Sequence, residues 1–485
     1  MTLEVPDPDR FRWSADAIRE VGYRFVDLIA DHLTSLPDRP VFTPYPPALR
    51  DELLAAPLPE DGVDAATLLE ELARFVEPYP FGNGHPRFYG WVNPPPAVIG
   101  VFAEALASAM NPSVAGGNHA AVHLETLVVR WLAELLGFPA GTGGLLVSGG
   151  SMATLTGLAV ARTVALGPEV RAEGLVGDPG RTRGRPRIYV GVEAHSCVRK
   201  SAELLGLGHD ALRVIPSDAD RRIDVDALRS AIAADRRAGD HPLAVVASAG
   251  TVNTGAIDPL EAIADLCAAE HLWMHVDAAY GGPAILSARY RAELAPIARA
   301  DSIAVDPHKW LYVPVEAGLC LCRDPAAMRA TFSHVPAYLR TDGDPDGVGG
   351  PMWRSEIGFQ QTRGFRALKI WACLRFHGLR GYTLAIEHDI ALAARLAAAV
   401  AQAPELELAA KPGLSVVCFR LRGDVDGGRT RAALRRLQIG GEAFVAGTEI
   451  DGRAAMRACV VNPRAREEDI DRLVAAVRSI ARDLG

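Results

Sequence analysis

Lysine is scarce in this chain of 485 residues. Of its 51 basic residues only four are lysine, at positions 200, 309, 369 and 411, and the other 51 − 4 = 47 are arginine. One of the four is kept in the stretch SIAVDPHKWLYVP, residues 302–314. Arginine cannot replace lysine where an uncharged amine must react with a carbonyl, because its guanidinium stays protonated. Lys309 is therefore a candidate for such chemistry.

Long apolar runs and targeting signals are also missing. Nowhere do about 18 uncharged apolar residues follow one another, so no transmembrane helix is expected. The first residues, MTLEVPDPDRFRW, combine acids and prolines and lack the apolar stretch of a signal peptide. We therefore expect a cytoplasmic protein with no membrane partner.

Basic tracts and cysteine motifs are absent as well. The net charge is −8 and the isoelectric point about 5.9, which argues against a nucleic-acid partner. Seven cysteines, an odd number, are scattered through apolar segments without a C-x-x-C pair or a histidine at ligand spacing. They predict buried free thiols and no metal site. Cys320 and Cys322 alternate in GLCLC and are expected on one face of a strand.

The chain divides into three parts by pattern. Residues 1–84 hold two helical runs around a proline-rich linker, with Ser14 as a candidate cap, and each run carries an apolar stripe that needs a partner. Residues 85–395 alternate short apolar runs with helical patterns, which predicts an α/β domain with a mainly parallel sheet. Residues 396–485 predict a small α+β domain. We expect the first part to pack on another surface, such as that of another subunit.

Candidate chemistry follows the apolar runs of the middle part. Lys309 follows DSIAV, Asp277 ends HLWMHV, His195 ends RIYVGVEA, and the turn 148–151, SGGS, opens a helix. In open α/β sheets ligands bind at the carboxyl ends of strands. Taken singly, each feature has an ordinary structural explanation, such as a surface amine, a helix cap or a tight turn. Taken together they suit pyridoxal 5′-phosphate, which needs an amine for its aldehyde, a carboxylate for its ring nitrogen and N–H groups for its phosphate.

At these residues the chain resembles the group II pyridoxal-dependent decarboxylases, the family of aromatic-L-amino-acid and glutamate decarboxylases. The resemblance runs from about residue 10 to 480 and is carried by motifs in a fixed order: HPRFYGW (85–91), SGGSMATLTGLAVAR (148–162), EAHSCVRKSAELLGLG (193–208), ASAGTVNTGAIDPL (247–260), MHVDAAYGG (274–282), DPHKWL (306–311), TRGFRALKIW (362–371) and MRACVVNPRAREEDID (456–471). It implies the fold-type I architecture: a seven-stranded sheet in the large domain, a helical arm that wraps a partner in a homodimer, and active sites at the subunit interface.

The resemblance also implies a role for each matching residue. Lys309 would form the Schiff base with the cofactor, and Tyr338, on a loop rich in Gly, Pro and Asp, would protonate the substrate carbon after CO₂ leaves. The other implied catalytic or cofactor-binding residues are His195, His308, Asp277, Thr251, Ala279, Ser148, Gly149, Gly150 and Ser151. Arg457, Trp91 and Tyr89 are the implied substrate-binding residues, although a domain-anchoring salt bridge is the alternative for Arg457.

Some positions depart from the family pattern and leave alternatives open. Asn111 and Ser113 lie where aromatic-amino-acid decarboxylases carry bulky apolar residues, so a polar or acidic substrate remains an alternative to an aromatic one. Asp306 replaces an asparagine that other members hold near the phosphate. The leading hypothesis is α-decarboxylation of an L-amino acid. The alternatives are an aldehyde synthase, an aminotransferase or a non-catalytic scaffold, and the presence of Lys309, Asp277, His195 and Thr251 argues against the scaffold.

Overall fold

The computed structural model describes residues 11–175, 184–335, 344 and 346–484. Its centre is a seven-stranded sheet in the order β2-β8-β7-β6-β5-β3-β4, in which only β8 runs antiparallel to its neighbours. The strands are β2 (Gly143–Val147), β3 (Pro186–Gly191), β4 (Leu212–Ile215), β5 (His241–Ser248), β6 (Trp273–Asp277), β7 (Ser302–Val305) and β8 (Gly318–Cys322). The predicted mainly parallel seven-stranded sheet is confirmed.

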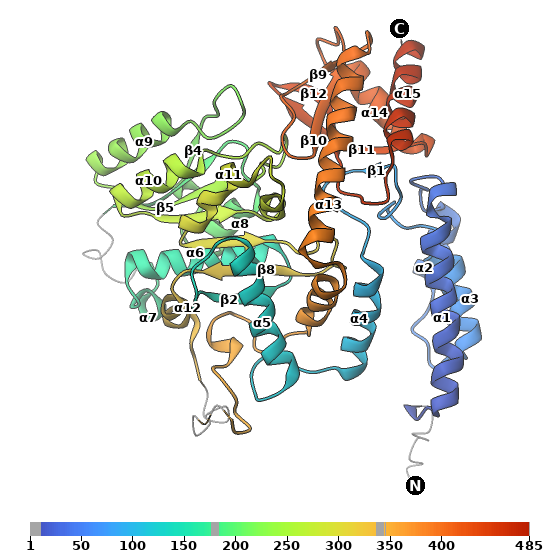
Figure 1. The fold of residues 1–485 in the computed structure, drawn as a ribbon, viewed down its shortest axis with the longest axis horizontal. Helices are drawn as coiled ribbons and strands as arrows, with labels where there is room; N and C mark the ends of the chain where they lie inside the picture. Colours follow the sequence, from blue (N-terminus) through green and yellow to red (C-terminus); the bar gives the residue numbers. More distant parts are fainter. Residues whose placement is uncertain (1–10, 176–183, 336–343, 345, 485) are drawn as a thin grey trace.

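Both faces of this sheet are covered by helices (Figure 1), and alternate residues of each strand enter different cores. Val245 joins the core with α5 (Ala120–Leu135), α9 (Val225–Arg237), α10 (Leu260–Glu270) and α13 (Arg366–Gln402). Its neighbours Ala244 and Val246 face α6 (Gly150–Leu166) and α8 (Cys197–Leu204). Cys320 and Cys322 share one core with α6 and α12 (Pro325–Phe332), as the alternation predicts, and all seven cysteines are buried and free.

A second sheet has the order β1-β11-β12-β10-β9 and packs against α14 (Gly428–Gly440) and α15 (Glu467–Asp483). Its strands are β1 (Phe88–Tyr89), β9 (Leu406–Leu408), β10 (Val416–Leu421), β11 (Phe444–Ile450) and β12 (Arg453–Cys459). Strand β1 pairs parallel with β11, so residues expected in the large domain join the second sheet. Helix α13, which is kinked at Gly378, also extends past the expected boundary at residue 395 and contributes residues to the cores of both sheets.

The first helices are α1 (Ala15–Ser35), α2 (Pro47–Ala55) and α3 (Ala65–Phe75), which lie together at one side of the molecule (Figure 1). The Ser14 Oγ accepts a hydrogen bond from Ala17 N over 3.1 Å, which confirms the predicted cap. None of the three helices contains a buried residue. Within the described ranges, no helix is both long and apolar enough to cross a bilayer.

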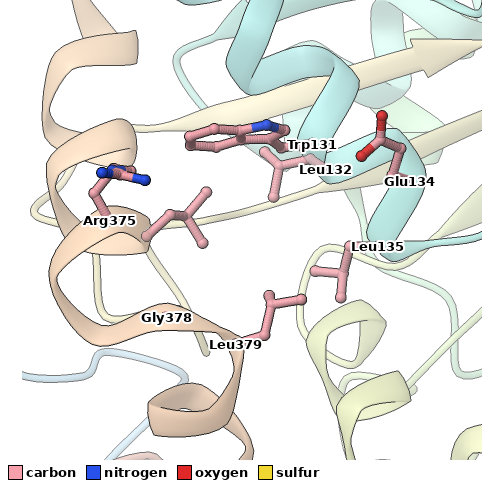
Figure 2. A pocket seen from close by; sticks show the side chains of 8 residues that line it. Trp131, Leu132, Glu134, Leu135, Arg375, Gly378 and Leu379 are labelled. Carbon is pink, nitrogen blue, oxygen red and sulfur yellow. The ribbon is translucent and has the colours of Figure 1, made fainter.

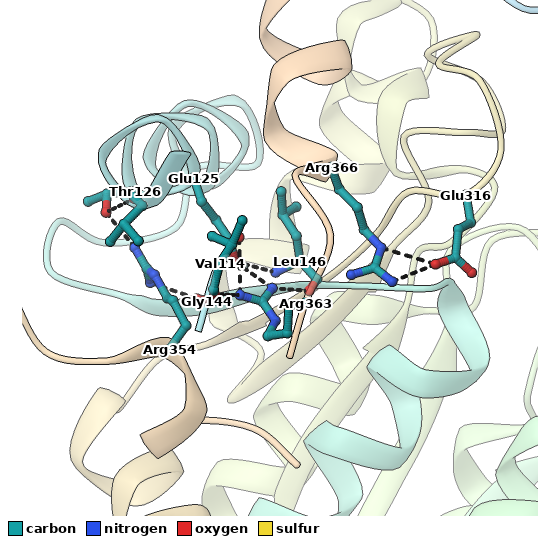
Figure 3. Close-up of polar contacts among 10 residues, drawn as sticks. Val114, Glu125, Thr126, Gly144, Leu146, Glu316, Arg354, Arg363 and Arg366 are labelled. Atoms are coloured by element: carbon teal, nitrogen blue, oxygen red, sulfur yellow. Dashed lines mark hydrogen bonds and ion pairs between the residues drawn. The ribbon is translucent and has the colours of Figure 1, made fainter. Parts of the chain in front are cut away.

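A buried ion pair joins three segments at the edge of the large sheet (Figure 3). Arg363, before α13, lies 2.7 Å from the Glu125 carboxylate on α5, and both side chains are almost fully excluded from solvent. Arg363 also donates to the carbonyls of Val114 and Leu146, and Glu125 accepts from Leu146 N. Because Leu146 precedes the 148–151 turn, this pair fixes the strand that leads into the candidate site.

Candidate active site

A cavity of about 570 Å³ opens at the carboxyl edge of the large sheet, next to the second sheet. Its lining brings together most of the residues that the sequence singled out: Lys309, His308, His195, Asp277, Thr251, Ala279, Ser148, Gly149, Gly150, Ser151, Arg457 and Trp91. These residues come from seven separate motifs of the chain. Strand ends, helix starts and loops that are distant in sequence therefore meet around one space.

Lys309 lies in the loop between β7 and β8 and forms an ion pair within it. Its Nζ is 2.9 Å from Oδ2 of Asp306, a residue with 2% relative exposure. Burial lowers the pKa of the Lys309 ammonium, but the carboxylates of Asp306 and Asp277 outweigh that effect, and the pKa lies above its ordinary value. Lys309 must therefore release a proton and leave Asp306 before its nitrogen can react as a nucleophile.

Asp277 and His195 flank the same space. Asp277 is the last residue of β6, and its Oδ1 accepts a hydrogen bond from Ala279 N over 3.1 Å, which leaves the other oxygen free to face the cavity. His195 Nδ1 accepts from Cys197 N over 3.1 Å. Burial lowers the pKa of His195, so we assign a neutral ring with its proton on Nε2. A neutral, flat ring at a cavity wall suits stacking against an aromatic ligand.

The turn 148–151 connects β2 to α6 and presents the start of that helix to the cavity. Free N–H groups and the helix dipole make such a place suited to an anion. A Cβ added at Gly150 would lie 2.9 Å from Asp306 Oδ2 and 3.0 Å from the Ala279 Cβ, so glycine is required there. A reactive amine, a carboxylate and an anion cradle around one space fit the donor set that pyridoxal 5′-phosphate needs.

Thr251 and His308 are held by hydrogen bonds of their own loops. The Thr251 Oγ1 accepts from Ala256 N and lies 3.0 Å from Thr254 Oγ1. His308 Nδ1 is 2.7 Å from the Ala317 carbonyl, at the entry to β8. Both side chains are thus oriented before any ligand arrives.

Arg457, on β12, reaches the cavity from the second sheet. Its Nε donates to the Asn253 carbonyl over 3.2 Å and its Nη1 to the Trp91 carbonyl over 3.0 Å. No carboxylate among the described residues lies within ion-pairing distance of it, so the domain-anchoring salt bridge considered for this residue is not present there. Its charge remains available to an anionic ligand.

The two aromatic residues of HPRFYGW differ in their surroundings. Trp91 is 46% exposed, lines the cavity and packs near Phe81 and Phe444, with ring centroids 5.0 and 5.6 Å away. Tyr89 is fully buried in the core of the second sheet and does not line the cavity. The expected contact of Tyr89 with substrate is therefore wrong, because pairing with β11 turns its side chain inward. Tyr338 lies outside the described residues.

The cavity also contains residues that sequence reasoning missed. Asn253 donates to Glu193 Oε2 over 2.9 Å and accepts from Thr448 Oγ1 over 2.7 Å, so it ties the His195 loop to the second sheet. The one sequence feature that could have identified Asn253 is its position in the motif GTVNTG. Glu316 lines the rim and pairs with Arg366 over 2.5 Å (Figure 3). The two residues of this pair are 50 positions apart in the chain, and no sequence motif predicts that they interact.

A second cavity of about 450 Å³ lies between α5 and α13. Figure 2 shows that its lining is mainly hydrocarbon from Trp131, Leu135 and Leu379, with Glu134 and Arg375 at its edges. None of the candidate site residues lines it. The cavity around Lys309 is therefore the candidate active site.

Comparison with known proteins gives one family over most of the chain. Residues 47–422 match the pyridoxal-dependent decarboxylase conserved domain. An aromatic-L-amino-acid decarboxylase of Bacillus atrophaeus is 34% identical over 484 residues, covering 98% of each chain. An L-2,4-diaminobutyrate decarboxylase of Rhizobium meliloti (strain 1021) is 36% identical over 442 residues, 88% of this chain and 84% of that one.

A solved structure agrees with the sequence relatives. The crystal structure of Oryza sativa TDC with PLP and tryptamine superposes with a TM-score of 0.89 at 28% identity, over 97% of this chain and 99% of the other.

Proposed function

The chain belongs to the pyridoxal-dependent decarboxylase family, and we propose that its Lys309 cavity removes the α-carboxylate of an aromatic L-amino acid. It is a carboxy-lyase that uses pyridoxal 5′-phosphate. The observation that carries the site assignment is the convergence of the Lys309 amine, the Asp277 carboxylate, the neutral His195 ring and the start of α6 on one cavity. When bound, the cofactor supplies a carbonyl that bonds to an amine and a pyridinium ring that accepts the electron pair left on the substrate carbon when CO₂ departs.

The residues of the chain then have distinct tasks. Lys309 would hold the cofactor through its amine. Asp277 would keep the ring nitrogen protonated, since a carboxylate within hydrogen-bonding distance favours the cationic ring. His195 and Ala279, which line the cavity, would pack against the ring. We assign to Tyr338 the proton that returns to the substrate carbon.

Arg457 and Trp91 supply the substrate contacts in this proposal. Arg457 is fixed by two backbone carbonyls and keeps its positive charge for the carboxylate of the amino acid. Trp91 is half exposed at the mouth and offers a flat apolar surface to an aromatic side chain. The relative from Bacillus atrophaeus, whose name states an aromatic substrate, supports the same choice.

A diamino acid is the second candidate substrate. The relative from Rhizobium meliloti acts on 2,4-diaminobutyrate by its name, and Glu316 places a carboxylate at the cavity rim. Glu316 is already paired with Arg366, which leaves less of its charge for a substrate ammonium. The aromatic substrate is therefore the better supported choice.

The test is a substrate panel with two products measured. Purified enzyme with added cofactor is given L-Trp, L-Tyr, L-Phe, L-Dopa, L-Glu and L-2,4-diaminobutyrate, and CO₂ and amine are quantified. Equal amounts of CO₂ and aromatic amine support the proposal. Release of aldehyde, ammonia and peroxide would overturn it in favour of an aldehyde synthase, and turnover of the diamino acid alone would overturn the aromatic assignment.

We also propose a homodimer in which residues 1–84 are the dimerisation arm, 85–395 the cofactor-binding domain and 396–485 a small second domain. Support comes from apolar side chains that the described chain leaves in solvent. Ile18 on α1 is 57% exposed, and Phe102 and Leu106 on α4 (Val98–Met110) are 43% and 56% exposed. Apolar stripes of this size on two elements call for a partner surface.

A further inference from the structure

Asp306 places a buried carboxylate inside the cradle proposed above for the cofactor's phosphate. Its side chain is 2% exposed and lies against the glycines of the 148–151 turn. A Cβ added at Gly150 would be 2.9 Å from Oδ2, and one added at Gly149 would be 3.9 Å from Oδ1. The carboxylate therefore lies directly beside the start of α6, where an anion is expected to bind.

The two oxygens of this carboxylate differ in their partners. Oδ2 accepts the ion pair of Lys309 Nζ, 2.9 Å away. Oδ1 is buried and has no hydrogen-bond partner within the described parts of the chain. An ionised carboxylate only accepts hydrogen bonds, so Oδ1 requires a donor. Leaving a buried acceptor unsatisfied is unfavourable.

The phosphate of the cofactor has two ionisation states near neutral pH. The doubly ionised form carries only acceptors and would add two negative charges beside Asp306. The singly ionised form keeps one O–H, which can donate to Oδ1, and it carries one charge fewer. The second ionisation of a phosphate monoester lies at about pH 6.

We propose that Asp306 selects the singly ionised phosphate, whose O–H donates to Asp306 Oδ1, so that one proton is taken from solvent when the cofactor binds above about pH 6. This inference rests on the proposed location of the cofactor in the Lys309 cavity. An asparagine at position 306 would instead offer an N–H donor and accept the doubly ionised form.

Other titratable groups face the same space and must be separated from Asp306. They are Lys309, Asp277, His195, Cys197, Tyr280, Glu316, Arg457 and His308, whose Nε2 is 3.8 Å from Asp306 Oδ2. Lys309 stays charged throughout the neutral range, because its pKa lies above the ordinary value. All of these groups remain in Asp306→Asn, and Asp277 still raises the pKa of Lys309 there, so the variant removes only the Asp306 carboxylate.

The first experiment measures binding of pyridoxine 5′-phosphate, which has an alcohol in place of the aldehyde and cannot bond to Lys309. Its dissociation constant is determined by calorimetry between about pH 6.5 and 8.5, a range chosen above the second phosphate ionisation. For the wild type we expect binding to weaken up to about tenfold per pH unit, the slope of one proton taken up. Asp306→Asn should lose that slope, and Asp301→Asn, at the opposite end of β7, should keep it.

A steep slope that persists in Asp306→Asn would overturn the proposal, since another group, such as a histidine or the ring nitrogen of the probe, would then be its source. A flat profile in the wild type would also overturn it. Failure of the wild type to bind the probe at any pH would overturn the cavity assignment on which the proposal rests.

The second experiment needs no variant. Phosphorus NMR of pyridoxine 5′-phosphate bound to the wild type at about pH 8, two units above the second ionisation, should give the chemical shift of the singly ionised form. The shift of the doubly ionised form under the same conditions would overturn the proposal.

Discussion

Arg457 is the residue whose substrate role can be separated from a structural one. Two backbone carbonyls hold it, and no described carboxylate pairs with it. A charged hydrogen bond to substrate contributes about 1.5–3 kcal/mol, which is roughly 10- to 150-fold in binding. We expect Arg457→Ala to raise KM by about that factor with a smaller loss of kcat.

Steady-state kinetics and thermal melting of Arg457→Ala and Arg457→Lys check this. Lysine should rescue poorly, because it cannot reach both carbonyls and still present a planar pair of donors. A large fall in melting temperature with an unchanged KM would mean that Arg457 only holds the two sheets together.

The sequence predicted most residues of the candidate site but not the ion pair that two of them form. Asp277, His195 and Lys309 follow apolar runs, and parallel strands bring their carboxyl ends to one edge. Tyr89 was assigned wrongly because a two-residue strand gives no periodicity from which to read its direction. The ion pair of Asp306 with Lys309 depends on the turn geometry of the loop, which composition does not encode.

The buried ion pair of Arg363 and Glu125 joins helix α5 to the segment before α13. Removing one partner of such a pair leaves an uncompensated charge and costs about 3–5 kcal/mol. We therefore expect Arg363→Ala to lower the free energy of unfolding by that amount, and Glu125→Leu combined with Arg363→Met to restore part of it.

Urea unfolding of the three proteins measures the difference. An Arg363→Ala variant as stable as the wild type would contradict the role given to this pair. The exposed pair of Arg130 and Glu134 on α5 supplies the control, because its removal should change stability by less than about 1 kcal/mol.

Helix α13 carries a buried carboxylate that anchors the segment after Lys309. Asp389 accepts from Trp310 Nε1, Tyr312 O–H and Asn462 N. Burial raises the pKa of Asp389 to about 7, although these hydrogen bonds oppose it. Its folded form therefore binds a proton more tightly than its unfolded form, and its contribution to stability falls as pH rises from about 4 to 7.

Asp389→Asn removes this ionisation. We expect the melting temperature of the variant, relative to the wild type, to be higher at pH 8 than at pH 5, because the wild type loses stability as the pH rises to about 7 and the variant does not. Each pKa unit corresponds to about 1.4 kcal/mol. A difference in melting temperature between variant and wild type that is the same at both pH values would contradict the raised pKa of Asp389. Asp226→Asn, at an exposed residue, serves as the control for loss of one charge.

The pattern of elements was predictable because alternation in strands and spacing in helices are local properties. The short strand β1 was not, since it exists only through pairing with β11, more than 300 residues away in the chain. Nor did periodicity show that α13 continues past residue 395, because a helix that passes between two cores changes its buried face along its length.

The exposed apolar side chains on α1 and α4 predict a dimer, and charged substitutions among them should disrupt it. We expect Phe102→Asp combined with Leu106→Asp to yield a monomer, because two charges in an apolar interface lack partners. Light scattering after size exclusion checks this. A wild type that is monomeric and fully active would contradict the proposed dimer, and Phe376→Asp, also at an exposed apolar residue but on α13, tests whether the interface extends there.

The most direct test of the account is to find which lysine holds the cofactor. The enzyme loaded with pyridoxal 5′-phosphate is reduced with borohydride and digested, and the modified peptide is identified by mass spectrometry. We expect label on Lys309 alone, with both label and CO₂ release lost in Lys309→Ala and kept in Lys411→Ala, whose lysine is exposed. Label on Lys200, Lys369 or Lys411, or sustained CO₂ release by Lys309→Ala, would contradict the assignment of the active site.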